Sequence, residues 1–141
     1  MLTQGGDASL DTLYQEACQE YGTTPGLFVN APMNSVGSAF VARDPDRAWA
    51  TLGPHMLHDA QMYAAWMGDM PTSTKSVAAT VEDLRAENGN YRIFTPEEAV
   101  AHIRETGNLA TQPLSGGVPP DLAWESLELI ANEVIPAVQA R

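Results

Sequence analysis

Apolar positions recur at two spacings along this chain, and each spacing predicts one kind of element. From Ser9 they return every three or four residues, which predicts a helix with Ser9 as its N-cap and Gly22 just after its end. Residues 26–30 read as a short extended segment. Residues 1–8 are polar and glycine-rich, so we expect a disordered N-terminus there, followed by a single α/β domain over residues 9–141.

A strand, a short turn and a capped helix then follow one another three times. The strands are predicted at 39–43, 91–94 and 109–114, and the helices that follow them begin at Pro45, Pro96 and Pro120. Asp44 is the expected N-cap of the first helix, and Thr95 with Glu98 forms a capping box on the second. Strands joined through helices pair in parallel, and right-handed crossovers would place all three turns at one edge of the sheet.

Two further features interrupt this pattern. Gly53 and Pro54 lie inside the helical pattern that starts at Pro45, and proline cannot continue the hydrogen-bond ladder. We therefore expect a second helix with a new direction from this point. Residues 67–80 read as a loop or insertion, followed by a short helix over residues 81–87.

The predicted fold class depends on how parallel strands can be covered. Such strands require helices on both faces or closure into a barrel, and a complete (β/α)₈ barrel takes about 250 residues. The chain has 141 residues, and three or four strands are too few to close a ring. The sequence therefore predicts a small open α/β domain, a piece that pairs with another copy, or a truncated barrel.

Charge and cysteine content narrow the choice of partners. The formal net charge of −11 would repel nucleic acid and anionic membrane surfaces, and no apolar stretch approaches the roughly 20 residues that span a bilayer. Cys18 is the only cysteine, which excludes a disulfide within the chain, and no secretory signal is recognisable. We expect a cytoplasmic protein.

The stretch "LGPHMLHDAQMYAAW" places His55, His58 and Asp59 on one side of a helix. This string lacks a further strong zinc ligand, so we assign no metal. His102 belongs to another helix and is expected at the surface. Imidazole titrates near neutral pH, which makes His55 and His58 candidates for acid–base chemistry, while packing or capping is the alternative for both.

A second candidate is the turn Ser115–Gly116–Gly117 before the last helix. Two glycines at a helix N-terminus let backbone N–H groups approach an anion such as phosphate. The prolines that follow remove donors and no Lys or Arg is nearby in the sequence, so a plain turn is the alternative.

Three blocks of the sequence together resemble the C-terminal segment of luciferase-like monooxygenases. They are "FVARDPDRAWATLGPHMLHDAQMYAAW", "YRIFTPEEAVAHIRE" and "PLSGGVPPDLAWESLELIANEVIPAV", and the likeness runs from about Leu10 to Val138. The family consists of flavin- or deazaflavin-dependent oxidoreductases built on a (β/α)₈ barrel. The resemblance implies a partial TIM barrel in which residues 39–43 and 109–114 are late strands.

The resemblance also implies roles for the candidate residues. His55 and His58 would be catalytic, Tyr63 and Trp66 would contact a small-molecule substrate, and Ser115, Gly116 and Gly117 would lie beside FMN or a deazaflavin. The early strands that supply most flavin contacts in the family are absent here. Catalysis is then expected to need a missing N-terminal barrel half or a homo-oligomer. The alternative function is a non-catalytic α/β module that homodimerises.

Overall fold

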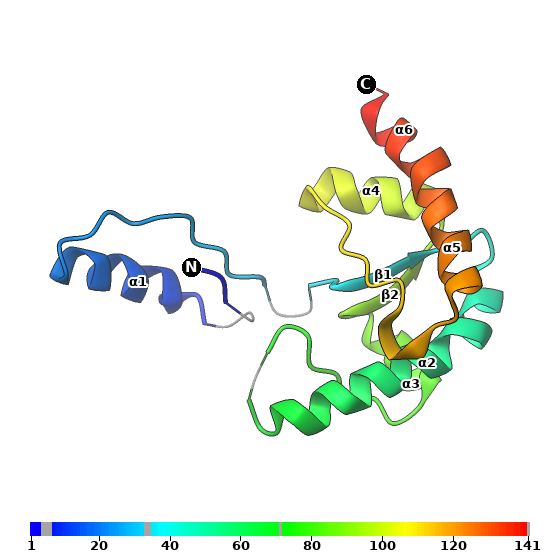
Figure 1. Cartoon of the computed structure of the whole chain (residues 1–141), viewed down its shortest axis with the longest axis horizontal. Helices are drawn as coiled ribbons and strands as arrows, with labels where there is room; N and C mark the ends of the chain where they lie inside the picture. The colour runs from blue at the N-terminus through cyan, green and yellow to red at the C-terminus, as the bar shows by residue number, and fades with distance from the viewer. Residues whose placement is uncertain (4–6, 33–34, 71, 141) are drawn as a thin grey trace.

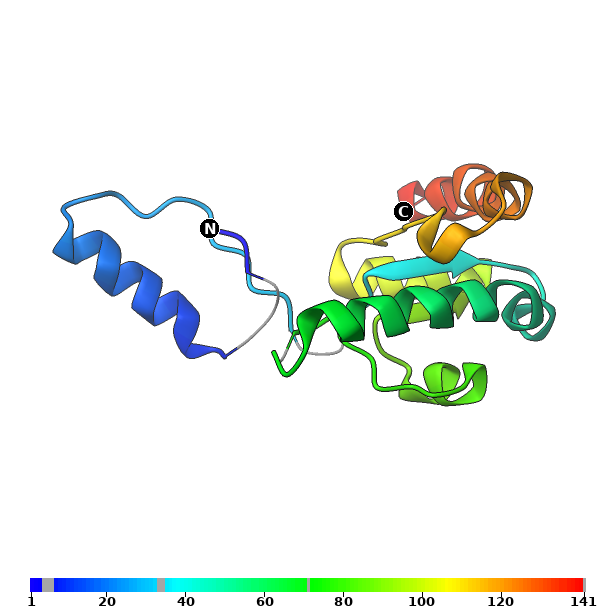
Figure 2. The ribbon, with the colours of Figure 1, turned by 60° about the horizontal axis from the view of Figure 1, so that its bottom comes forward.

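The computed structural model describes residues 1–3, 7–32, 35–70 and 72–140. In both ribbon views, residues 1–3 and 7–32 form an N-terminal arm that stands apart from residues 35–70 and 72–140, which we call the body (Figures 1 and 2). The elements in chain order are α1 (Ser9–Glu20), β1 (Ser38–Val41), α2 (Pro45–Met67), α3 (Val81–Glu87), β2 (Tyr91–Phe94), α4 (Pro96–Thr106), η1 (Ser115–Gly117), α5 (Pro120–Leu129), η2 (Ile130–Val134) and α6 (Ile135–Gln139). In the described ranges, no helix is both long and apolar enough to cross a membrane.

The two strands pair in parallel, from Ser38 opposite Tyr91 to Val41 opposite Phe94. The strand predicted at 91–94 is confirmed at the same residues, and the one predicted at 39–43 is confirmed with shifted ends. The described residues thus form a helix-dominated α/β fold around a two-stranded parallel sheet. The predicted α/β class is confirmed at this level.

Both faces of the sheet are covered by helices (Figure 2). Phe40, Tyr91 and Ile93 lie in one core cluster with side chains of α2 and α3. Val41 and Phe94 lie in a second cluster, whose other members come mainly from α4 and η2. A barrel strand keeps one face for the barrel interior, whereas this pair is enclosed by its own chain on both sides.

The strand predicted at 109–114 is absent, and the outer edge of β1 is satisfied in another way. The N–H of Ala39 donates to the carbonyl of Ala110 at 2.9 Å. The next outward N–H, that of Val41, donates to the side-chain oxygen of Ser126 on α5 at 2.7 Å. Because a serine hydroxyl replaces a strand carbonyl at this position, no ladder extends beyond one bond.

The direction of this segment also corrects an expectation about the turns. The side chain of Gln112 donates to the carbonyl of Gly37, and the Ser115 hydroxyl lies 3.4 Å from that of Ser38. The segment therefore runs back toward the start of β1 and places η1 there. The turn at Asp44 follows the other end of β1. The three turns do not share one edge, since a parallel third strand never forms.

Helix α2 continues through Gly53 and Pro54, so the expected second helix is wrong. Figure 2 shows the first turns of α2 nearly end-on and its later turns from the side, which is the change of direction that the proline predicts. Gly53 has a packing reason: a Cβ there would lie 2.5 Å from the side chain of Val81 at the start of α3. The glycine thus allows α2 and α3 to approach each other.

The helix caps of the body follow the sequence closely. Asp44 accepts a hydrogen bond from the backbone of Arg47, and Thr80 and Thr95 each form a full capping box. The helix predicted from Pro120 is also confirmed, and it continues through the π-helical turn η2 into α6. These caps involve residues at most three positions apart, so local chemistry decides them.

The arm consists of α1 and an extended segment that packs on it. The rings of Tyr14 and Phe28 stack with centroids 5.5 Å apart, and Leu2 forms a parallel bridge with Val29. Residues 26–30, expected as an extended segment, thus contribute a single bridge. Of the residues predicted to be a disordered N-terminus, 4–6 lie outside the described residues.

Helix α1 begins differently from the expectation. Ala8 is the N-cap and makes no side-chain cap, while the Asp7 carboxylate accepts a hydrogen bond from the N–H of Ser9 at 2.8 Å. This bond lowers the pKa of Asp7. Ser9 is therefore the first helical residue and the expected Ser9 cap is wrong. Gly22 has the left-handed φ of 63° expected after the helix end.

Replacing Ser126 with alanine leaves the buried N–H of Val41 without its acceptor. We expect S126A to lower the free energy of unfolding by about 1–3 kcal/mol, the cost of an unsatisfied buried donor. Urea unfolding measures this value. The matched control is S35A, whose hydroxyl bonds the Pro32 carbonyl at an exposed site. Equal losses in the two variants would contradict the role assigned to Ser126.

Candidate functional site

The two stretches that the sequence singled out meet in the structure. His55 on α2 lies with its Nδ1 3.2 Å from the carbonyl oxygen of Gly116 in η1. The N–H of Gly116 donates to one carboxylate oxygen of Asp59, one helical turn further along α2, at 3.2 Å. Both polar backbone groups of Gly116 are therefore bonded to side chains of α2.

Tyr91, the first residue of β2, completes this cluster. Its hydroxyl donates to the other carboxylate oxygen of Asp59 at 2.7 Å. Burial, followed by the hydrogen bond to the Asp59 carboxylate, raises the pKa of the Tyr91 phenol. The phenol thus remains protonated and acts as a hydrogen-bond donor. We call His55, Asp59, Tyr91 and Gly116 the Asp59 cluster.

The close approach of η1 to α2 requires glycine at one position. Gly116 has a φ of 61°, and a Cβ there would lie 1.9 Å from the backbone oxygen of His55. Gly117 also has a positive φ, of 76°, but a Cβ there would meet no atom within 4 Å. The first glycine therefore has a packing role that the second does not share.

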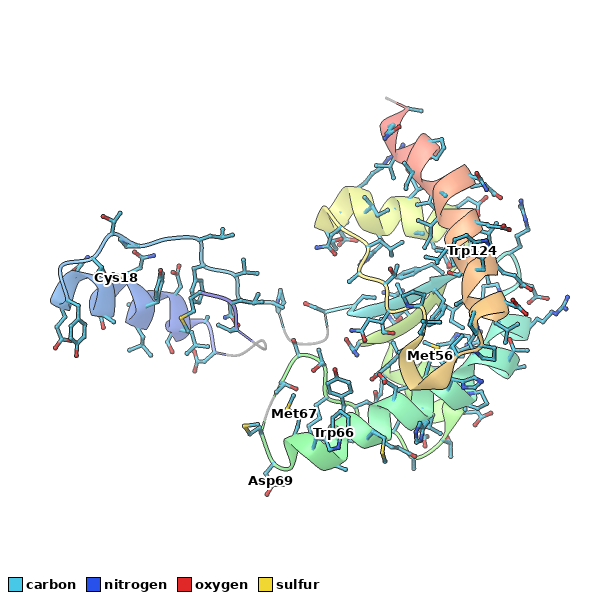
Figure 3. The ribbon with its side chains drawn as sticks, viewed as in Figure 1. Cys18, Met56, Trp66, Met67, Asp69 and Trp124 are labelled. Atoms are coloured by element: carbon cyan, nitrogen blue, oxygen red, sulfur yellow. The ribbon has the colours of Figure 1, made fainter. Side chains whose placement is uncertain are left out.

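The remaining candidates are not drawn into the cluster. His58 is exposed on α2, and its imidazole forms no hydrogen bond with the side chains or backbone of the described residues. Tyr63 is half-buried, and its ring centroid lies 5.6 Å from that of Trp66. Figure 3 places Trp66 toward the end of α2. The predicted catalytic and substrate-contacting roles of these residues stay predictions.

The geometry leaves one free chemical group in the Asp59 cluster. With Nδ1 of His55 donating to the Gly116 carbonyl, its Nε2 atom is a hydrogen-bond acceptor without a partner among the described residues. Gly116 has no backbone group to offer a phosphate, and the Asp59 carboxylate beside it would repel one. The residues at η1 therefore do not fit the phosphate end of a flavin or deazaflavin.

Sequence analysis placed Asp59 beside His55 without assigning it a role, and it missed Tyr91. Asp59 lies four residues after His55, so its position on the same helix side is readable from the sequence. Tyr91 gives no comparable signal. Its approach to Asp59 depends on the packing of α2 against the sheet, which no local spacing encodes.

A cavity of about 620 Å³ lies at the opposite, carboxyl end of β1, between α2 and the α5–η2 helix. Its floor is apolar and includes Val41, Leu52 and Leu129, and Ser126 also lines it. In open α/β folds, ligands bind at the carboxyl ends of the strands. Its position and size make this cavity the second candidate site.

The charges around this cavity do not favour an anion. Arg43 and Arg47 are its two cations, and Arg43 is paired with Glu133. The lining carboxylates are Asp44, Glu125, Glu128 and Glu133. Because acids outnumber bases, the cavity also does not fit the phosphate of a cofactor.

The other titratable groups add no metal site. Among the described ranges, no group of three or more His, Cys, Asp and Glu side chains could hold a metal ion. His102, expected at the surface, is half-buried and stacks on Phe94 with ring centroids 5.0 Å apart. The guanidinium of Arg92 lies 4.4 Å from the centre of the same Phe94 ring.

No protein-family model, curated protein or solved structure matches this chain.

Alanine at the two glycines of η1 provides a matched comparison. We expect G117A to lower the free energy of unfolding by about 1–2 kcal/mol, the cost of a left-handed φ for alanine. G116A should lose at least ~1–3 kcal/mol more because its Cβ overlaps the backbone of His55. Urea unfolding of both variants measures the difference, and equal losses would show that η1 does not pack against α2 as described.

His102 provides a pH test. Partial burial, followed by the positive charge of Arg92, lowers the pKa of His102 from 6.5, while Glu105 opposes the shift. Below pH 6.5 the unfolded chain binds more protons at this residue than the folded chain does, so the free energy of unfolding falls with falling pH until the folded pKa is passed. H102Q should lack this component.

Urea unfolding above and below pH 6.5 measures the pH dependence of the free energy of unfolding in the wild type and in H102Q. His55 and His58 are present in both proteins, so the difference between the two pH dependences reports on His102 alone. A native His102 pKa at or above 6.5 in an NMR titration would refute the prediction.

Proposed function

We propose that this chain is the C-terminal portion of a luciferase-like flavin- or deazaflavin-dependent monooxygenase, organised as part of a (β/α)₈ barrel. The observation that carries the proposal is the arrangement of β1 and β2. They are adjacent, parallel and in register, and each leads at its carboxyl end into a proline-started, capped helix. This strand–turn–helix unit is the repeating element of such a barrel.

The open edge of β2 supports the entry of further strands there. Within the described part of the chain, β2 pairs with β1 alone. The outer edge of β1 is engaged by Ala110 and Ser126, which leaves β2 as the edge able to accept a new strand. Closure of a barrel also requires one sheet face to turn inward. The proposal therefore requires α4 to leave the Val41–Phe94 face when the missing strands are present. It also requires Ala110 and Ser126 to leave the outer edge of β1, because each strand of a closed barrel pairs on both edges.

The two candidate sites differ from a cofactor site, and this difference indicates which part of the barrel would bind the cofactor. When bound, a reduced flavin or deazaflavin supplies hydride transfer or oxygen activation. Neither η1 nor the cavity fits the phosphate of such a cofactor, so we assign its seat to the missing part of the barrel. This chain would contribute the wall of the cavity at the carboxyl end of β1, whereas His55 lies at the amino end of the strands, away from this cavity.

A binding experiment tests this proposal. We expect the isolated chain to bind FMN and deazaflavin more weakly than ~100 µM, less than about 6 kcal/mol of binding free energy, because it lacks a phosphate seat. Co-expression with the N-terminal barrel half of a luciferase-like enzyme should yield a co-purifying complex with flavin absorbance. The control is the same N-terminal half expressed alone.

The outcomes separate the candidate functions. Tight cofactor binding by the isolated monomer would contradict the assignment of the seat to the missing part. Failure to co-purify with any such half, with a colourless product, would favour the alternative of a non-catalytic α/β module that homodimerises.

A further inference from the structure

The arm carries an apolar face that the described residues leave uncovered. Leu2 pairs with Val29, and Leu27 lies on the same side of the extended segment as Val29 because side chains alternate along it. Phe28, between them, stacks on Tyr14 of α1. Leu2, Leu27 and Val29 therefore point away from α1, and the two leucines are each 80% exposed. We call these three residues the arm face.

The arm cannot gain much stability from its own contacts. Among its described residues, Cys18 is the only one that is buried. Fixing a backbone costs roughly 1–2 kcal/mol per residue, which must be offset by burial of apolar surface. An apolar β layer with one uncovered face is stabilised by packing that face against a second layer.

The body exposes a second apolar surface near the arm. Met62 and Trp66 are neighbours one turn apart on α2, and Met70 follows the end of this helix. Trp66 is 74% exposed, and Met62 and Met70 are also exposed. Figure 3 shows Trp66, Met67 and Asp69 at the end of α2 that lies toward the arm. We call Met62, Trp66 and Met70 the α2-end patch.

The charges near the two surfaces contribute little to their attraction. The arm contains no Lys or Arg, and its charged side chains are Asp7, Asp11, Glu16 and Glu20. Of these, Asp11, Glu16 and Glu20 lie on α1, from which the arm face points away. Beside the α2-end patch, the Lys75 ammonium donates to the carbonyl of Gly68, and the acidic Asp69 comes next in the chain. The burial of apolar side chains must therefore supply the stability of the contact.

We propose that two copies of this chain form a symmetric dimer in which each arm face packs on the α2-end patch of the other copy. At roughly 150 Å² per fully exposed large side chain, one such contact buries about 600 Å² over both surfaces. Two reciprocal contacts reach about 1,200 Å², the lower limit of stable interfaces, whereas one contact does not. The area is therefore sufficient for an exchange between two copies, and in this structure the arm stands apart from the patch of its own chain. This inference does not depend on the proposed function.

Single variants and their mixture test the exchange. Wild-type chain should sediment with twice the monomer mass of 15.1 kDa at micromolar concentration. L27D on the arm face and W66S on the α2-end patch should each weaken dimerisation at least about tenfold. An equimolar mixture should form a mixed dimer of intermediate affinity. In it, the intact arm of the W66S copy meets the intact patch of the L27D copy.

Matched controls keep the test specific. L13D changes an exposed leucine on α1 outside the arm face, and W124S removes an exposed tryptophan on α5. Both should dimerise like the wild type, and circular dichroism should show unchanged folding in all four variants. A monomeric wild type, a mixture that forms no mixed dimer, or equal weakening by the controls would overturn the proposal. A monomer whose arm folds onto its own patch in X-ray scattering would also overturn it.

Discussion

The fold of the body depends on the enclosure of β1: helices bury both of its faces, and hydrogen bonds engage the backbone on both of its edges. Its side chains are buried between two helical layers, and its inner edge pairs with β2. Its outer edge cannot reach water, so each outward N–H requires an acceptor. Ala110 provides one and Ser126 provides the other. The serine hydroxyl of α5 thus fixes where the C-terminal helices lie, and it also closes this edge to further strands.

The Asp59 cluster has a structural role in the same body. Asp59 bonds β2 through Tyr91 and η1 through Gly116, so one carboxylate joins three elements of the body. Both oxygens of this carboxylate are hydrogen-bonded at the amino end of the strands. Barrel enzymes place their catalytic residues at the opposite, carboxyl end. The cavity at the carboxyl end of β1 is better placed for a ligand, although its charges exclude a phosphate seat.

The proposed function and the proposed dimer both start from surfaces that the chain leaves exposed. The edge of β2, the arm face and the α2-end patch are surfaces of kinds that proteins normally cover. For β2, the proposed cover is the addition of further barrel strands. For the two apolar surfaces, the proposed cover is a second copy, whose α2-end patch packs on the arm face and whose arm face packs on the α2-end patch. The two proposals concern different surfaces, so either can hold without the other.

The sequence determined the features that depend on neighbouring residues. The caps at Asp44 and Thr95, the turn glycine Gly22 and the parallel pairing of two strands were predictable because each involves local hydrogen bonds or chain connectivity. The tertiary structure decided that residues 109–114 form no strand, because the competing acceptor, Ser126, comes from a distant helix. It also decided that Gly116 is enclosed by α2, and that the arm stands apart, since burial depends on which segments meet in space.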